Sequence, residues 1–141
     1  MTGDAGERGV IAANLAFYRA LERREISEMD RVWSHGEDVS CVHPGWHRLD
    51  GWDEVRRSWQ NIFANARSWT VTCERVRVST EGALALVACL EVIRPAVAAQ
   101  GEAARMQATN LFRREEQGWR MVHHHASPFA EEAASSSEPV N

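Results

Sequence analysis

The amino-acid sequence predicts an α+β domain in which three helices pack on a curved, mainly antiparallel sheet of about six strands. Its apolar residues recur mostly at helical spacing up to about residue 65 and alternate from Trp69 onward. The run from Ala83 to Ile93 is apolar on both sides, so one face of this strand needs a layer of helices and the other a second cover. The 141 residues suffice for one domain, expected at 7–129 between disordered ends at 1–6 and 130–141.

The three helices are expected at residues 7–24, 26–35 and about 52–63. Apolar residues at helical spacing predict the first, from Glu7 to about Arg24. Ser27 and Asp30 resemble a capping box and predict the start of the second. Acidic residues at the start of the third favour a helix N-terminus. The apolar stripes of the first and third helices are formed by Ile11, Leu15, Tyr18 and Leu21, and by Trp52, Val55, Trp59, Ile62 and Phe63.

The strands begin with a short pair, 38–43 and 46–49, separated by the turn-forming Pro44 and Gly45. The long strand that starts at Trp69 changes the parity of its apolar residues, which predicts a β-bulge near Glu74–Arg75. The two-sided apolar strand follows. A final hairpin then turns at Gly118, which can supply the positive φ of a short loop.

The final hairpin carries three consecutive histidines. Pairing across its turn puts His123 and His125 on the same face as Asn110, and His124 on the opposite face. An apolar surface with a few convergent polar groups is typical of a small-molecule site. The alternative is that the two histidines are half-buried and bonded to backbone carbonyls. The apolar residues expected on the face of His123 are Met106, Ala108, Phe112, Trp119 and Met121.

Charge and cysteine usage exclude several classes of function. The net charge of −4 is spread along the chain without a basic stripe, so nucleic acid is not an expected partner. We see no membrane-length apolar stretch and no export signal, and therefore expect a cytoplasmic protein. Cys41, Cys73 and Cys89 are expected to be reduced core thiols. All the basic residues are arginine, which excludes lysine Schiff-base chemistry.

A metal site is not expected. His43, His47 and the histidine triplet could converge, but they lack the H-x-x-x-H or H-x-H-plus-carboxylate spacing of a specific site. We therefore expect neither a metal nor another cofactor.

Three segments resemble the SnoaL-like branch of the nuclear transport factor 2-like superfamily. They are F-Y-R-A-L-E-R-R-E-I, D-V-S-C-V-H-P-G-W and F-R-R-E-E-Q-G-W-R-M-V-H-H-H-A-S-P, and the resemblance covers about Val10 to Pro128. It implies a cone-shaped fold with a pocket between the concave sheet and the helices, and a first strand beside the last. It also implies a homodimer through the outer sheet face. This dimer would cover Val87, Cys89 and Ile93, which we expect to face outward.

The resemblance implies two classes of function. One is a pocket for a small apolar or aromatic ligand, with the cofactor-independent chemistry of an isomerase, cyclase or dehydratase. His123 or His125 would then be the acid/base, with Asp38 the nearest carboxylate. The other is a non-enzymatic dimerisation or ligand-sensing module resembling the calmodulin-dependent kinase II association domain, favoured if aromatic side chains of the first helix fill the cone. The expected ligand-binding residues are Tyr18, His43, Trp46, Trp59, Phe63, Asn110 and Phe112.

Overall fold

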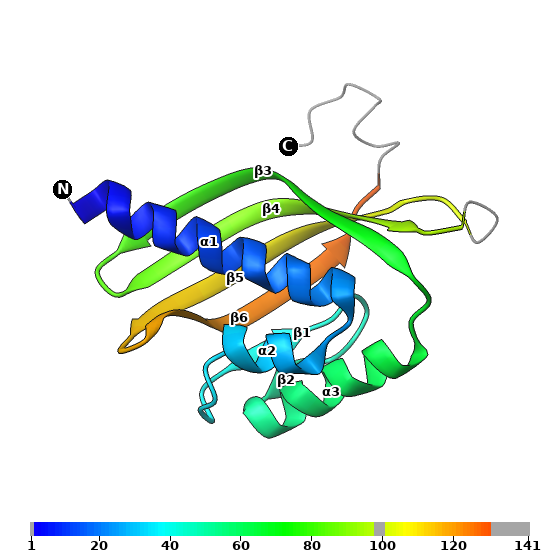
Figure 1. Ribbon diagram of the computed structural model, residues 1–141, viewed down its shortest axis with the longest axis horizontal. Helices are drawn as coiled ribbons and strands as arrows, with labels where there is room; N and C mark the ends of the chain where they lie inside the picture. The colour runs from blue at the N-terminus through cyan, green and yellow to red at the C-terminus, as the bar shows by residue number, and fades with distance from the viewer. Residues whose placement is uncertain (1, 98–100, 131–141) are drawn as a thin grey trace.

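The computed structural model describes residues 2–97 and 101–130, with side chains described from Gly6 onward (Figure 1). Three helices and six strands confirm the predicted α+β class. The helices are α1 (Thr2–Arg23), α2 (Ile26–Val32) and α3 (Trp52–Asn65). The strands are β1 (Ser40–Val42), β2 (Leu49–Asp50), β3 (Trp69–Glu81), β4 (Leu84–Pro95), β5 (Ala104–Glu115) and β6 (Gly118–Pro128).

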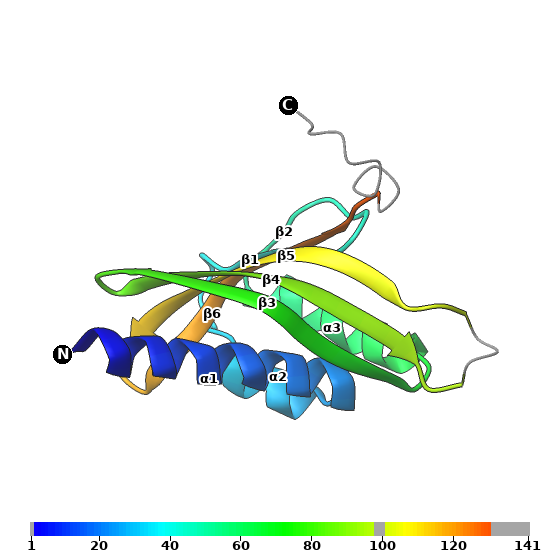
Figure 2. The same ribbon diagram turned by 90° about the horizontal axis from the view of Figure 1, so that it is seen from above.

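The six strands form one curved sheet in the order β2-β1-β6-β5-β4-β3. Strand β1 runs parallel to β6, with Cys41 opposite His124, and the other neighbours are antiparallel. This confirms the predicted place of the first strand beside the last. All three helices lie on one side of the sheet, α1 along its length (Figure 2). The sheet and helices thus enclose an interior to which β4, β5 and β6 contribute the central wall.

Helix α1 begins at Thr2, earlier than the expected Glu7 and inside the segment expected to be disordered. Its buried stripe also differs from the predicted one, because Ile11 and Leu15 are 39% and 49% exposed. The side chains that face the sheet are Val10, Asn14, Phe17, Tyr18 and Leu21. Asn14 and Phe17, which were expected to flank the stripe, lie at its centre, because the helix is rotated toward them relative to the predicted face.

The start of α2 corrects a second expectation. Glu25 is the N-cap residue and makes no side-chain capping bond, so Ser27 and Asp30 do not form a capping box. Asp30 instead accepts two hydrogen bonds from Arg56 of α3, at 2.7 and 3.0 Å. The acidic residue therefore joins two helices rather than starting one.

Two β-bulges shape the sheet. The predicted bulge in β3 is confirmed, because Glu74 pairs with Leu90 and Arg77 with Ala88, and Arg75 has a φ of 53°. The second bulge, in β6, was not predicted. Leu111 pairs with His123 and Phe112 with Met121, so Val122 is an extra residue in β6. One extra residue moves every side chain beyond it to the other face of the sheet.

The second bulge reverses the predicted faces of the three histidines. His124 lies opposite Asn110 and is 2% exposed, while His125 is exposed and His123 half-buried. The assignment of His123 and His125 to the face of Asn110 is therefore wrong. It is His124 that points into the interior.

The predicted faces of β4 are also reversed. Val87 and Cys89 are buried under the helices, at 0% and 4% exposure, and do not face outward. Leu84 and Leu86, which alternate with them, are 48% and 40% exposed on the outer face.

Within the described residues, no helix is long and apolar enough to cross a membrane.

Candidate functional site

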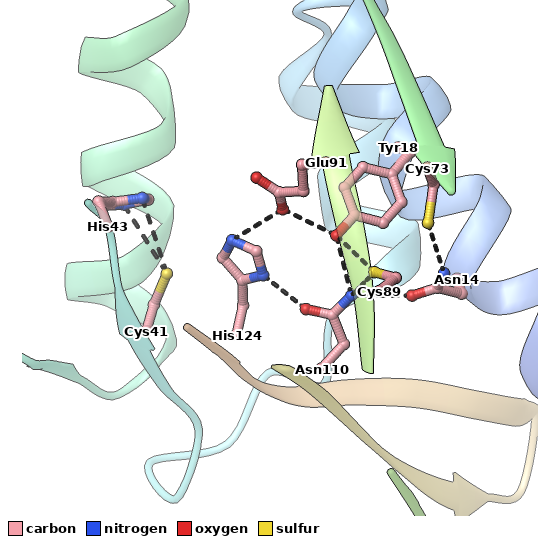
Figure 3. Close-up of polar contacts among 9 residues, drawn as sticks. All are labelled: Asn14, Tyr18, Cys41, His43, Cys73, Cys89, Glu91, Asn110 and His124. Atoms are coloured by element: carbon pink, nitrogen blue, oxygen red, sulfur yellow. Dashed lines mark hydrogen bonds and ion pairs between the residues drawn. The ribbon is translucent and has the colours of Figure 1, made fainter. Parts of the chain in front are cut away.

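A cluster of polar side chains lies in the interior between α1 and the central strands (Figure 3). Helix α1 contributes Asn14 and Tyr18, and the strands contribute Glu91, Asn110 and His124. All five are buried, with exposures between 0% and 3%. A polar or charged group at such depth is costly unless it is hydrogen-bonded, so the contacts within the cluster decide whether it is stable. We call these five residues the interior cluster.

Asn110 is the centre of the interior cluster. Its Nδ2 donates to Asn14 Oδ1 at 2.8 Å and to Tyr18 Oη at 3.1 Å. Its Oδ1 is 2.6 Å from His124 Nδ1. Since this amide oxygen can only accept, the proton of that bond belongs to Nδ1 of the imidazole. The neutral His124 ring therefore keeps a free lone pair on Nε2.

The free nitrogen of His124 faces a carboxyl group. Its Nε2 lies 3.7 Å from Glu91 Oε2, beyond hydrogen-bond length. Tyr18 Oη donates to the same Oε2 at 2.7 Å. Tyr18 thus holds the carboxyl of Glu91 in place, and Asn110 holds the imidazole of His124. In these orientations Oε2 of the carboxyl faces Nε2 of the imidazole.

Burial shifts the pKa values of the facing pair in opposite directions. It raises the pKa of Glu91 to about 7, although the hydrogen bond from Tyr18 acts in the other direction. It lowers the pKa of His124 well below its ordinary value, with further lowering by His43, His123 and His125. The contact is therefore not an ion pair near pH 6. A neutral acid stands opposite a neutral base.

Tyr18 remains protonated in this environment. Burial, followed by the nearby charge of Glu91, raises the pKa of its phenol well above the ordinary value. Tyr18 is therefore a hydrogen-bond donor rather than a base. Its hydroxyl also lies 3.4 Å from Cys89 Sγ.

His43 belongs to a second buried group, between β1 and α3. Ser58 Oγ donates to the carbonyl of Val55 at 2.6 Å, so the proton between His43 Nε2 and Ser58 Oγ, 2.8 Å apart, is on the imidazole. Burial lowers the pKa of His43 to about 4. Cys41 Sγ lies 3.8 Å from the same ring. This histidine is neutral and bonded, and the serine has no base available to activate it.

Aromatic rings fill the space between the two buried groups. Trp59 contacts the His43 ring at a centroid distance of 4.6 Å and lies 6.0 Å from the His124 ring. Phe17 of α1 packs against His124 at 4.7 Å and Trp59 at 5.7 Å. The indole Nε1 of Trp59 is buried and has no hydrogen-bond partner in the described part of the chain. An unpaired buried donor of this kind is available to an acceptor that enters the site.

The remaining predicted residues are distributed more widely. Phe112 is fully buried in the core, and Phe63 packs on Trp59 with ring centroids 5.7 Å apart. Trp46 is 45% exposed and lies edge-on to His43. Tyr18, His43, Trp59 and Asn110 are thus the predicted ligand-binding residues that line the interior.

The predicted catalytic residues lie outside the interior. His123 Nδ1 is 2.7 Å from Ser40 Oγ, and its ring centroid is 6.2 Å from that of the exposed His125. Asp38, the nearest candidate carboxylate, is at the surface, where it accepts a hydrogen bond from Arg113 at 2.7 Å. No three potential metal ligands converge among the described side chains.

Sequence reasoning missed Glu91 and His124. A signal for Glu91 was present, because it is the one carboxylate in the otherwise apolar run from Ala83 to Ile93 and shares the parity of Val87 and Cys89. No comparable signal existed for His124, since its neighbours on both sides are also histidines.

The family model of the SnoaL-like domain matches residues 10–131. The chain belongs to this family. A solved structure of a candidate dehydratase from the NTF2-like family of Streptomyces avermitilis is 39% identical, with a TM-score of 0.82 over 92% of this chain and 99% of that one. A candidate calcium/calmodulin-dependent protein kinase type II association domain from Thiobacillus denitrificans is 33% identical, with a TM-score of 0.78 over 84% and 94% of the two chains.

One curated protein, the F-box protein SKIP8 of Arabidopsis thaliana, is 29% identical over 126 residues. The match covers 87% of this chain and 51% of that protein, so the chain spans about half the length of this relative. These comparisons confirm the SnoaL-like branch of the NTF2-like superfamily, a fold suited to ligand binding and shared by proteins of different functions.

Proposed function

We propose that this SnoaL-like domain binds a small, largely apolar ligand in its interior and transfers protons on it without a cofactor, as a dehydratase would. Glu91 and His124 are the proposed acid and base. The observation that carries the proposal is their geometry: two buried, neutral groups face each other across 3.7 Å, each held by a partner on its other side. Buried titratable groups that face each other and whose pKa values are shifted in opposite directions are typical of acid–base sites.

The pair is suited to the dehydration of a β-hydroxy ketone. Nε2 of His124 takes the proton from the carbon next to the carbonyl, and the carboxyl of Glu91 gives its proton to the departing hydroxyl, which leaves as water. The electron pair of the broken C–H bond forms the new carbon–carbon double bond. The imidazolium then returns a proton to the Glu91 carboxylate, which restores both groups without any other reactant.

A ligand oxygen also has a donor available to it. The unpaired Nε1–H of Trp59 lies in a ring 6.0 Å from the His124 ring, and a carbonyl oxygen would satisfy it. Phe17 packs against both rings, so a ligand reaches His124 only when the phenyl ring turns away. Phe17 and Tyr18 of α1 thus occupy the interior, which is the condition that favours the non-enzymatic alternative. The proposed pocket is therefore one that opens on binding.

The test is turnover and binding with a panel of small β-hydroxy ketones, beginning with 3-hydroxycyclohexanone, whose dehydration product absorbs in the ultraviolet. We expect His124→Ala and Glu91→Gln to lower the rate by a factor of about 10²–10⁴, the usual contribution of an acid–base group. His125→Ala, which alters an exposed neighbour in the same strand, is the matched control and should leave the rate unchanged. Equal rates in all three variants, or no turnover and no binding across the panel, would refute the proposal.

A second candidate function is assembly through the outer face of the sheet. Leu84 and Leu86 are exposed there, and Leu111 pairs with Leu86 across β4 and β5. Adjacent apolar side chains on one face favour a partner. The alternative of a dimerisation module therefore rests on these leucines, and not on Val87, Cys89 and Ile93 as the sequence suggested.

We expect Leu86→Arg to convert a homodimer into a monomer, because the guanidinium would have to be buried unpaired in the interface. Sedimentation velocity at micromolar concentration measures the change. Leu15→Arg is the matched control, since Leu15 is similarly exposed but lies on α1. A native chain that sediments as a monomer would refute the dimer.

The cytoplasm is the proposed location. Cys41, Cys73 and Cys89 are free thiols, of which Cys41 and Cys89 are buried in the core. Unpaired cysteines of this kind are typical of a reducing compartment.

A further inference from the structure

A hollow of about 380 Å³ lies on the helical side of the molecule, between α1, α2 and the start of β6. It is separate from the interior cluster, none of whose members lines it. Its floor is apolar and consists of Ala13 and Ala16 of α1, Val32 of α2 and Trp119 of β6. The small alanine side chains leave the space open, and the volume is within the range of small-molecule sites.

Trp119 is a fixed wall of this hollow. A Cβ atom at Gly9 would lie 3.0 Å from the indole Cδ1, so the glycine lets the ring approach the backbone of α1 closely. The guanidinium carbon of Arg114 lies over the indole ring of Trp119, 5.3 Å from the ring centroid, in a cation–π contact. Because these neighbours hold the indole in place, the apolar surface exists before a ligand arrives, and binding loses little side-chain entropy.

The rim of the hollow is cationic. Arg19, Arg23 and Arg31 line it, with Glu28 as its one acidic residue. Glu28 is engaged by Arg23 in a salt bridge of 3.0 Å. The side chains of Arg19 and Arg31 make no hydrogen bond or salt bridge with any described residue and are exposed. Two guanidinium groups from different helices are thus left to receive an anion.

We propose that this hollow binds a small organic anion, namely a carboxylate attached to a compact apolar body. The apolar body lies on Trp119 and the alanines, and the carboxylate receives hydrogen bonds from Arg19 and Arg31. Helices α1 and α2, which border the hollow, lie on one side of the sheet (Figure 2). Leu84 and Leu86 are exposed on the other face, so a dimer through that face leaves the hollow accessible.

Sodium 2-naphthoate is a suitable probe, with the uncharged 2-naphthamide as its matched ligand. We expect naphthoate to shift the indole N–H resonance of Trp119 in heteronuclear NMR spectra, and naphthamide to bind at least about tenfold more weakly. The double variant Arg19→Gln/Arg31→Gln should weaken naphthoate binding at least about tenfold and leave naphthamide binding unchanged. Higher salt should weaken only the binding of the anion.

The control is Arg57→Gln/Arg67→Gln, which makes the same change of net charge on two exposed arginines elsewhere. It should retain the native affinity for naphthoate, as should Glu91→Gln in the interior cluster. The inference is overturned if the two ligands bind equally, if both double variants lose affinity to the same extent, or if naphthoate shifts the resonances of Tyr18 and His124 instead of Trp119. No binding of naphthoate at millimolar concentration also overturns it.

Discussion

Replacement of Glu91 by glutamine is expected to make the protein more stable than the native chain above pH 7, by about 3 kcal/mol. Burial raises the pKa of Glu91 from its ordinary 4.5 to about 7 in the folded state. The folded chain therefore holds a proton on this carboxyl over a pH range in which the unfolded chain has released it. The resulting stabilisation is fully present below pH 4.5 and is lost as the pH rises to about 7.

Glutamine imitates the protonated carboxyl at every pH. Its carbonyl oxygen can take the place of Glu91 Oε2 and accept the hydrogen bond of Tyr18, without a charge at any pH. The variant and the native chain should therefore have similar free energies of unfolding at pH 4.5, and the difference should grow up to about pH 7. The gain in stability comes with the loss of the proposed acid, as is common for residues of active sites.

Urea unfolding of both chains at several pH values measures this difference. His43 and His124 act in the opposite direction, because their lowered pKa values destabilise the folded state as the pH falls below 6.5. The contribution of His43 is the same in both chains and cancels in the difference, and above pH 6.5 neither histidine contributes. Glu81→Gln, at an exposed position of β3, is the matched control for the same substitution outside the interior. A constant difference between pH 5 and pH 8 for Glu91→Gln would mean that the carboxyl is ionised in the folded protein.

The general architecture could be predicted because it depends on periodicity. The change from helical to alternating spacing near Trp69 is explicit in the sequence, and so is the bulge of β3, where the apolar parity moves from Cys73 to Val76. No change of apolar parity indicates the bulge of β6. Met121 and Val122 are both apolar and the next three residues are all histidine, so a shift by one residue changes nothing in the visible pattern.

The candidate site was predictable only in part for the same reason. The positions of Asn110 and Tyr18 in the interior follow from the faces of β5 and α1, because neither element contains an irregularity before these residues. The position of His124 in the interior depends on the bulge of β6, which the sequence pattern does not indicate. Glu91 depends on which face of β4 meets the helices, and a strand that is apolar on both sides does not reveal this. A carboxylate inside such a strand was the better guide, since a buried charge is retained only where something compensates for its cost.

Replacement of Asn110 by alanine is expected to destabilise the protein by about 3–5 kcal/mol, because it removes the centre of the interior cluster. His124 Nδ1–H loses its acceptor at 2.6 Å, and Asn14 Oδ1 loses its donor at 2.8 Å. Each buried group left without a partner costs about 1–3 kcal/mol, and the missing side-chain volume adds to this. Asn65→Ala, at an exposed position near the end of α3, is the control and should change the free energy of unfolding by less than about 1 kcal/mol.

A double-mutant cycle with Asn14→Ala separates the hydrogen-bond network from simple packing. Asn14 also donates to Cys73 Sγ at 3.4 Å, a contact that is absent in either variant lacking Asn14 and so cancels in the cycle. Because the single Asn110 variant leaves Asn14 unsatisfied and the double variant does not, the two substitutions together should cost about 1–2 kcal/mol less than the sum of the single ones. Urea unfolding at pH 6.5 measures all four chains, and Asn14→Ala alone remains informative if Asn110→Ala does not fold. Additive effects at the two positions would show that the 2.8 Å contact between Asn110 and Asn14 contributes nothing to stability.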